Sequence, residues 1–374
     1  MDRRIFTKTA LGLVAGTVGL TQANAAEAVK QKPSPAASNP PSPDKFDDDS
    51  QNAIKVIQSK RGYKQPSKKA DGISTSILFF ADIHLVTKHL LKIKKFSEKY
   101  RKYIDDTVHL GDSVGAAYVG KFDLWDSYPT ALNVIGNHDT YDHKYPETLS
   151  DKSKYDIYFK KYVDSWNVVQ PENAEADGKC YWHKDYNKDV RLIGIDCMNP
   201  DDKQFAWFVN ALDSAQKAGL KVAIATHVPP SGDEGVDCNF NSLDYGGYKK
   251  KGECETATER FTRFVDAVDA FIDNGGCFVS WICGHFHHDR IMHTLDSKHK
   301  QLIIVMECAT DFNKWTDADH ARGTPTSTCW EIISIESISH VIKIARFGNN
   351  FDHYLRHKGT LCYDFKNHKL ISQY

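Results

Sequence analysis

Strand-length apolar segments recur from residue 77 onward, and this repetition limits the fold more than any other feature of the chain. Segments with helical patterning lie between several of them, and strands that alternate with helical connections predict an α/β fold with largely parallel early strands. After residue 300 the helical segments stop, so the last strands are expected to pair as antiparallel hairpins. The strand segments are Ile77–Ala81, Val108–Leu110, Leu132–Ile135, Arg191–Ile195, Val222–Thr226, Phe278–Cys283, Leu302–Met306, Trp330–Ile335, Val341–Ala345 and Thr360–Ser372, the last with a turn at 366–369; the helical segments are Val86–Tyr103, Lys154–Trp166, Asp201–Ala218 and Ala257–Asn274.

Polar side chains that bind metals follow successive apolar segments, at the points where the expected strands end. Open α/β sheets place their ligands beyond the carboxyl ends of the strands. One His or Asp at a strand end is usually a turn residue, but a whole series of them indicates a common site. The residues are Asp82 and His84, then Asp112, then Asn137, His138 and Asp139, then His227, and finally His285 and His287.

The chemistry of this set favours transition-metal ions. Carboxylate, imidazole and amide ligands suit Fe, Mn, Zn, Ni or Co, and the lack of Cys argues against a structural zinc site. The set is too large for one ion, whereas two ions about 3.5 Å apart that share a carboxylate would use all of it. Gly111, Gly136 and Gly284 precede three of the polar groups, and we expect them to let the backbone turn sharply there.

These residues resemble the motifs of the calcineurin-like metallophosphoesterase superfamily. The motifs are Asp82-Ile83-His84, Gly111-Asp112-Ser113-Val114-Gly115, Gly136-Asn137-His138-Asp139, His227 and Gly284-His285-Phe286-His287. The resemblance spans roughly residues 76 to 310 and implies a sandwich of two mixed β-sheets flanked by helices, in α-β-β-α layers. Gly115 departs from the family pattern, which usually has Asp or Asn there, but that position does not bind metal in the family.

The resemblance also implies roles. The first metal takes Asp82, His84, Asp112 and His287, and the second takes Asp112, Asn137, His227 and His285. The cofactors are then two divalent or Fe/Mn/Zn-type ions, and a metal-bound hydroxide attacks the phosphorus of a small phosphorylated substrate. His138 stabilises the transition state or protonates the leaving oxygen. Asp139 either orients His138 or supports the turn, and monoester and diester substrates are both compatible with this set.

The amino terminus has the pattern of an export signal. Residues 1–26 contain Arg3 and Arg4, a short Gly-rich apolar stretch and the small-x-small pattern of Ala23-Asn24-Ala25. Arg3 to Lys8 resembles a twin-arginine signal, which implies export of the folded protein by the twin-arginine translocase to the bacterial periplasm or medium. The apolar stretch is too short for a stable membrane anchor. The expected organisation is signal peptide 1–26, Pro-rich flexible linker 27–71, catalytic domain 72–350, and a β-hairpin extension of the same domain at 351–374.

The composition of the chain bears on its alternative functions. The 374 residues contain 48 Lys+Arg and 49 Asp+Glu, a net charge of -1 that does not favour a nucleic-acid partner. An exported nuclease and a non-catalytic metal- or ligand-binding protein remain the alternative functions, although a decayed site would have lost ligands and none is missing. Nine Cys cannot all pair within one chain, and a disulfide between Cys238 and Cys254 is left open.

Overall fold

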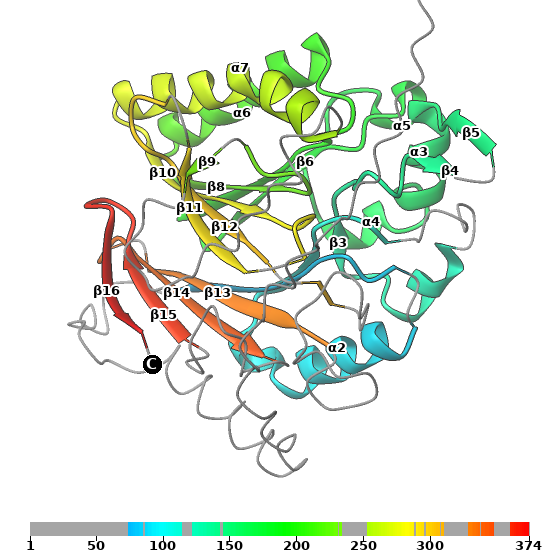
Figure 1. The fold of residues 1–374 in the computed structure, drawn as a ribbon, viewed down its shortest axis with the longest axis horizontal. Helices are drawn as coiled ribbons and strands as arrows, with labels where there is room; N and C mark the ends of the chain where they lie inside the picture. Colours follow the sequence, from blue (N-terminus) through cyan, green and yellow to red (C-terminus); the bar gives the residue numbers. More distant parts are fainter. Residues whose placement is uncertain are drawn as a thin grey trace, which may run out of the picture. The chain divides into compact units, whose positions relative to one another are not determined.

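The computed structural model shows two β-sheets packed between helices (Figure 1). It describes residues 74–84, 87–113, 122–142, 145–230, 232–233, 253–287, 289–294, 297–306, 308–309, 328–336, 338–347 and 360–373. All of them belong to one unit, residues 39–374. The expected signal peptide and linker, Gly115, and the question of a disulfide at Cys238 lie outside the described residues.

The first seven-stranded sheet has the order β16-β15-β14-β13-β1-β2-β3. Strands β1, β2 and β3 are parallel, and the other neighbours are antiparallel. This order confirms the expected change from parallel to antiparallel pairing along the chain. The strands are β1 (Thr75–Phe80), β2 (Asp106–His109), β3 (Leu132–Asn133), β13 (Trp330–Glu336), β14 (Val341–Phe347), β15 (Thr360–Asp364) and β16 (Lys369–Gln373).

The second seven-stranded sheet has the order β6-β7-β8-β10-β12-β11-β9. Its four inner strands β7, β8, β10 and β12 are parallel, and antiparallel strands occupy its edges. The strands are β6 (Trp182–Tyr186), β7 (Val190–Gly194), β8 (Lys221–Thr226), β9 (Gly232–Asp233), β10 (Cys277–Cys283), β11 (Arg290–Thr294) and β12 (Leu302–Val305), while β4 (Tyr141–Asp142) and β5 (Tyr145–Thr148) form a separate pair.

Helices cover the outer faces of both sheets, which completes the α-β-β-α layers that the resemblance implies. Helices α6 and α7 lie over the second sheet, and α2 lies over the first, where Phe96 packs against Trp330 and Phe347 (Figure 1). The helices are α2 (Thr87–Lys99), α3 (Asp151–Tyr158), α4 (Val163–Trp166), α5 (Ala174–Asp177), α6 (Asp202–Lys217) and α7 (Glu253–Asp273), with 3-10 turns η1 (Arg101–Tyr103) and η2 (Phe122–Ser127).

The inner strands of the second sheet are apolar on both faces because both faces are covered. Ile224 and Trp281 pack beneath α6 and α7, whereas their neighbours Ala225 and Ile282 face the core between the sheets. Successive side chains of a strand point to opposite faces, so a strand with two covered faces has an unbroken apolar sequence. This is why these strands can be recognised from sequence.

Two features differ from the sequence expectations. The expected single helix over 154–166 is two helices: α3 ends at Tyr158, and α4 ends at Trp166, where Asn167 follows with a left-handed φ of 53°. Strands β4, β5, β6, β9 and β11 were not expected. In β6 the residues between Trp182 and Tyr186 are His, Lys and Asp, so this edge strand lacks an apolar run.

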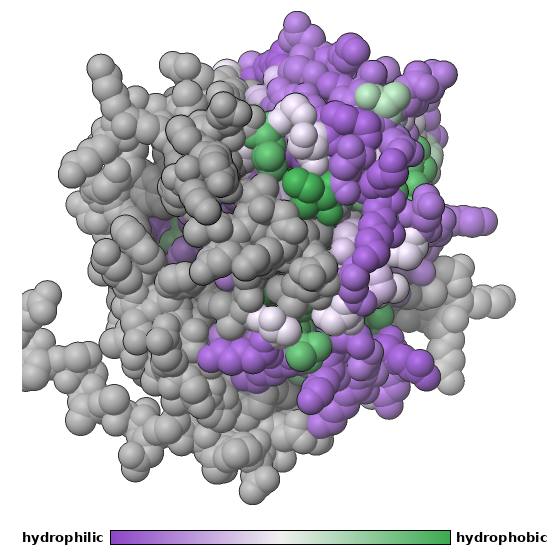
Figure 2. Space-filling view, turned by 90° about the vertical axis from the view of Figure 1, so that its right-hand side faces the viewer, coloured by the Kyte–Doolittle hydropathy of each residue, from purple (hydrophilic) through white to green (hydrophobic). Residues whose placement is uncertain are grey.

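The described surface is mostly polar. The face in Figure 2 is hydrophilic over most of its coloured area, and apolar side chains form small separate areas. The exposed large apolar side chains among the described residues are Leu91, Val169, Ile338 and Ile371. Within the described part of the chain, no helix has both the length and the apolar composition that crossing a membrane requires.

Candidate metal centre and active site

The polar residues that follow the strands meet at one end of the two sheets and form two ligand groups. Asp82, His84 and His287 form the first group, from the ends of β1 and β10. Asp112, His227 and His285 form the second group, from the ends of β2, β8 and β10. Within each group, one potential ligand atom from each residue lies within 4.8 Å of the others. The structure thus brings together the residues that the sequence pattern selects.

The first group has two imidazoles directed at one carboxylate. Nε2 of His287 is 3.1 Å from Oδ1 of Asp82 and 3.5 Å from Nε2 of His84. Nε2 of His84 is 3.9 Å from the same Asp82 oxygen. Two imidazole nitrogens and a carboxylate oxygen converge on one point, which is the arrangement that binds a cation.

The second group is oriented by the backbone. Nδ1 of His227 donates a hydrogen bond to the Leu110 carbonyl at 2.7 Å, which leaves Nε2 directed into the site. There Nε2 lies 2.9 Å from Oδ1 of Asn137 and 3.3 Å from Oδ2 of Asp112. An imidazole that donates from one nitrogen to a carbonyl presents the other nitrogen to a metal. The amide oxygen of Asn137 therefore lies beside His227, in the position that the resemblance assigns to a ligand of the second metal.

Asp112 is the carboxylate that both groups approach. Its Oδ1 accepts a hydrogen bond from the His138 backbone N–H at 2.8 Å, and its Oδ2 lies 3.8 Å from Nε2 of His138. Burial by itself would raise the pKa of Asp112, but His227, His138 and His84 outweigh it and hold the pKa well below its usual range. An ionised carboxylate near both groups can bridge two cations.

Asp82, His84 and His285 have protonation states that suit metal ligands. Burial would raise the pKa of Asp82, but His287 and His227 lower it to about 2. Burial lowers the pKa of His84 to about 4 and the pKa of His285 to about 3. Ionised carboxylates and neutral imidazoles are the forms that bind metals. Against the opposing effect of burial, Asp112 raises the pKa of His227 to about 9 and Asp82 raises that of His287, so these two imidazoles would give up a proton on binding a metal. The donor set therefore fits two transition-metal ions.

Backbone strain is concentrated at the ligands. The φ angle is positive at Asp82 (55°), His84 (44°), Asp112 (57°), His285 (72°) and His287 (58°). The left-handed region costs a non-glycine residue about 1–3 kcal/mol, and such residues cluster at functional sites. The surrounding fold thus stabilises a conformation that the isolated loops would not prefer, and this conformation directs the side chains into the site.

The three glycines of the motifs act in two different ways. Gly111 has a φ of +94°, as expected for a sharp turn. Gly136 and Gly284 instead permit close packing: a Cβ on Gly136 would lie 2.2 Å from N and from Oδ1 of Asp112, and a Cβ on Gly284 would lie 2.6 Å from that of Ala81. The chain also turns at these two glycines, because the Gly136 carbonyl accepts from the Asp139 N–H at 3.2 Å and the Gly284 carbonyl accepts from the Phe286 N–H at 2.9 Å.

Gly136→Ala is expected to displace the Asp112 carboxylate and to reduce metal affinity by about 10- to 100-fold, the range for loss of a group that positions a ligand. Elemental analysis after dialysis against limiting metal measures this effect. Gly219→Asn is the control, because a Cβ at Gly219 meets nothing within 4 Å and Asn tolerates its φ of +71°. Wild-type metal content in Gly136→Ala would show that Asp112 does not need this space.

Asp139 is bound to the backbone of the ligand loops. Its carboxylate accepts hydrogen bonds from the N–H groups of Asp112 (3.0 Å), Ser113 (2.9 Å) and Gly136 (2.9 Å). These contacts join the loops after β2 and β3. Of the two roles left open for Asp139, they favour support of the turn.

His138 occupies a different position from the ligand groups. Its side chain is 27% exposed, whereas the side chains of Asp112 and His227 are almost fully buried. Its ring lies edge-on to that of His84, with 5.2 Å between centroids. A side chain beside both ligand groups that is also open to solvent is well placed to meet a substrate.

Further residues support the ligand loops, and two of them, Tyr158 and His109, were not found from sequence. Tyr158 is buried, and burial together with the charges of Asp139 and Asp112 raises the pKa of its hydroxyl. Nδ1 of His109 lies 2.7 Å from Oδ1 of Asn133, beneath those loops. The side chain of Gln204 bonds the backbone N–H and carbonyl of Asp196, both within 3 Å, so it clamps the loop after β7. No spacing or motif marked Tyr158 or His109.

Two ligand groups at the carboxyl ends of two packed sheets define a metal-binding α/β sandwich with a dinuclear centre. The chain belongs to the calcineurin-like phosphoesterase family, whose model matches residues 75–289. By family, the chain is a phosphoester hydrolase. The family depends on two metal ions, and the two ligand groups match this requirement. A search of curated proteins gave no match.

Solved structures with a similar chain path are distant in sequence. A dimetal phosphatase from Danio rerio is 10% identical, with a TM-score of 0.48, and the match covers 78% of this chain and 99% of that chain. A putative 5'-nucleotidase from Staphylococcus aureus is 13% identical, with a TM-score of 0.35 and coverage of 70% and 50%. A protein serine/threonine phosphatase from Saccharomyces cerevisiae is 11% identical, with a TM-score of 0.29 and coverage of 88% and 90%.

Proposed function

We propose that this chain is an exported enzyme that hydrolyses a small phosphorylated substrate at a dinuclear metal centre. The observation that carries the proposal is the convergence of two ligand groups near one ionised carboxylate, Asp112. The left-handed φ angles at five of the ligands support the same function, because strain of this kind clusters at functional sites.

The residues divide between two metals as the resemblance implies. Asp82, His84 and His287 would hold the first ion. Asn137, His227 and His285 would hold the second, and Asp112 would serve both. Ions bound there would activate water and neutralise charge on the phosphoryl group. Asp139 and the Leu110 carbonyl keep the ligands in place for this purpose.

We assign His138 to contact with the substrate rather than to metal binding. The side chain is open to solvent, and its own backbone N–H bonds Asp112, so the ring is fixed beside the ligand groups. From there Nε2 can give a proton to the leaving oxygen or donate a hydrogen bond to a phosphoryl oxygen. Asp139 acts as a positioning residue through the backbone of the same loops.

A hydrolysis panel with the Mn-loaded protein tests the proposed function. The substrates are p-nitrophenyl phosphate, bis-p-nitrophenyl phosphate, cyclic nucleotides and a phospholipid head group. We expect at least one to be hydrolysed and a chelator to abolish the activity. A protein that binds two ions per chain and hydrolyses none of them would instead support the non-catalytic alternative.

The proposed location is the bacterial periplasm or medium, reached in the folded state. This proposal is supported by the arginine pair, the short Gly-rich apolar stretch and Ala23-Asn24-Ala25 in residues 1–26. The partner during export would be the twin-arginine translocase, and no stable membrane anchor is proposed.

Changing Arg3 and Arg4 to Lys is expected to leave unprocessed precursor in the cytoplasm, because the receptor of this pathway reads the arginine pair. Immunoblots of cell fractions measure the two forms. Lys8→Arg is the control, since it keeps the pair and the charge. Efficient export in a strain without the twin-arginine translocase would show that the general secretory route is used.

A further inference from the structure

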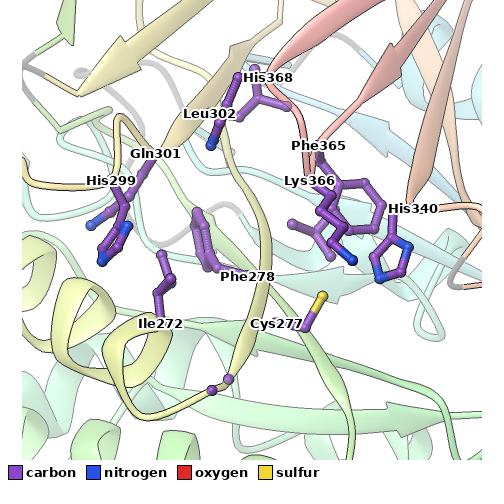
Figure 3. A pocket seen from close by; sticks show the side chains of 13 residues that line it. Ile272, Cys277, Phe278, His299, Gln301, Leu302, His340, Phe365, Lys366 and His368 are labelled. Atoms are coloured by element: carbon purple, nitrogen blue, oxygen red, sulfur yellow. The ribbon is translucent and has the colours of Figure 1, made fainter.

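A cavity of about 350 Å³ lies at the end of the second sheet that is opposite to the metal centre (Figure 3). It is lined by the turn after α7, the first residues of β10 and β12, His340 before β14, and the turn between β15 and β16. The metal ligands follow the other end of β10, and its seven residues span about 20 Å at ~3.3 Å each. The cavity is therefore separate from the active site.

One wall of the cavity is basic. Lys366, His340 and Cys277 lie together on one side, and His299 lies across the cavity from them (Figure 3). Lys366 is near enough to influence the pKa of both His340 and Cys277. The cavity thus presents several nitrogen donors to whatever it contains.

The acidic residues near this wall already have partners. Asp364 accepts hydrogen bonds from the backbone N–H groups of Lys366 (3.0 Å) and Asn367 (2.8 Å). Asp189 pairs with Lys221 at 2.7 Å. The salt bridge neutralises Asp189. The Asp364 carboxylate is occupied by the N–H groups of its turn but keeps its charge, which acts against burial on the pKa of His340 and His368.

Asp273, on the far wall, pairs with Lys298 at 2.6 Å and with His299 at 2.8 Å. Burial lowers the pKa of His340, and Lys366 and Lys221 lower it further. Burial, with His299 and Lys300, also lowers the pKa of His368 despite the opposing effect of Asp364. Lys366 therefore carries the fixed positive charge of the cavity, and the imidazoles of His340 and His368 are neutral hydrogen-bonding groups.

The rest of the lining is apolar and partly aromatic. Phe278 and Phe365 expose ring atoms to the cavity, with Ile272 and Leu302 beside them (Figure 3). Gln301 contributes little polarity, because its amide bonds Trp281, Val265 and Asp269. Apolar walls with a few directed polar groups, at this volume, are typical of sites for small organic molecules.

We propose that this cavity binds a small aromatic anion, with its charged group on Lys366 and His340 and its ring against Phe278 and Phe365. An anionic group on Lys366 gains a charge-assisted hydrogen bond. The ring gains burial and offset or edge contacts with the two phenyl rings. Within the described residues no metal-ligand group occurs here, so the histidines serve the organic ligand. The proposal does not depend on the chemistry at the metal centre.

Benzenesulfonate is the probe, because it has a fixed charge, contains no phosphoester and is a weak metal ligand. Titration calorimetry with the metal-loaded protein is expected to show one saturable site with a Kd of about 1 mM or tighter. Sulfate, which lacks the ring, and benzyl alcohol, which lacks the charge, should each bind about tenfold more weakly or worse. Absence of saturable binding, or equal affinity for all three compounds, would overturn the proposal.

Lys366→Met is expected to weaken benzenesulfonate binding about tenfold, the effect of one lost hydrogen bond to a charged group. Lys369→Met is the matched control, because Lys369 is exposed on the same hairpin and does not line the cavity. Both side chains are exposed, so both variants should fold. Equal affinities of the two variants would show that Lys366 does not hold the anion.

Cys277 gives an independent measure of where the probe binds. It is half-buried and lines the cavity, while the other cysteines with described side chains are buried. Benzenesulfonate at saturation should slow alkylation of Cys277 by iodoacetamide about tenfold, followed by peptide mass spectrometry. Saturable binding without protection of Cys277 would place the anion elsewhere and overturn the proposed site.

Discussion

Asp112→Asn is expected to cause the largest loss of any single substitution in the metal centre. Removal of one partner from a set of buried charges costs about 3–5 kcal/mol, which corresponds to a loss of about 10²–10⁴-fold in metal affinity. Asp112 belongs to the second ligand group, and His84 of the first group is near enough to help lower its pKa, so both ions should be affected and activity should fall at least as far. Elemental analysis and hydrolysis of p-nitrophenyl phosphate measure the two effects.

Asp196→Asn is the matched control for this substitution. Asp196 is also a buried carboxylate at a strand end, but it pairs with Lys154 at 3.1 Å and belongs to neither ligand group. This variant should be less stable to heat and still bind two ions per chain. If Asp112→Asn kept wild-type metal content and activity, the bridging role would be wrong.

His138→Ala is expected to lower turnover while the metal content stays the same. General acid catalysis contributes typically about 10²–10⁴-fold, so a loss in this range is expected for an alkyl phosphate, whose leaving group needs a proton. The loss should be smaller for p-nitrophenyl phosphate, because p-nitrophenolate leaves without one. Turnover of both substrates, at matched metal content, measures the difference.

His84→Ala is the control, because the adjacent His84 is assigned to metal binding, and this variant should lose metal. Equal losses of turnover on both substrates in His138→Ala, with metal retained, would mean that His138 only orients phosphoryl oxygens. Loss of metal from His138→Ala would make it a ligand or an essential support of one.

The ligands could be predicted from sequence because their positions follow from simple rules. Buried parallel strands appear as apolar runs, and the carboxyl ends of such strands meet at one edge, so Asp82, Asp112 and His227 were expected together. The fold class followed from the same strands and from the motif resemblance. These strands are buried on both faces, which makes their signal strong.

Other parts of the site carry no such signal. The positive φ angles of Asp82 and His287 result from packing of the whole sandwich. The sequence does not reveal them, because neither residue is a glycine. The bonds from Asp139 to Asp112 and Gly136 join loops that are distant in sequence. Strand β6 has polar residues on both faces between Trp182 and Tyr186, so its short pattern is hidden. Each of these features depends on tertiary neighbours rather than on local sequence.

The separation of the ligands along the chain has a consequence for the order of assembly. Asp82 and His287 are 205 residues apart, and β1 lies between β2 and β13, the latter formed only after residue 330. Loop closure over such lengths is among the slow steps of folding, so the first ligand group forms late. No amino-terminal fragment that stops before residue 287 can contain it. Metal loading must therefore follow synthesis of nearly the whole domain, and the compartment in which the chain folds determines which ions it meets first.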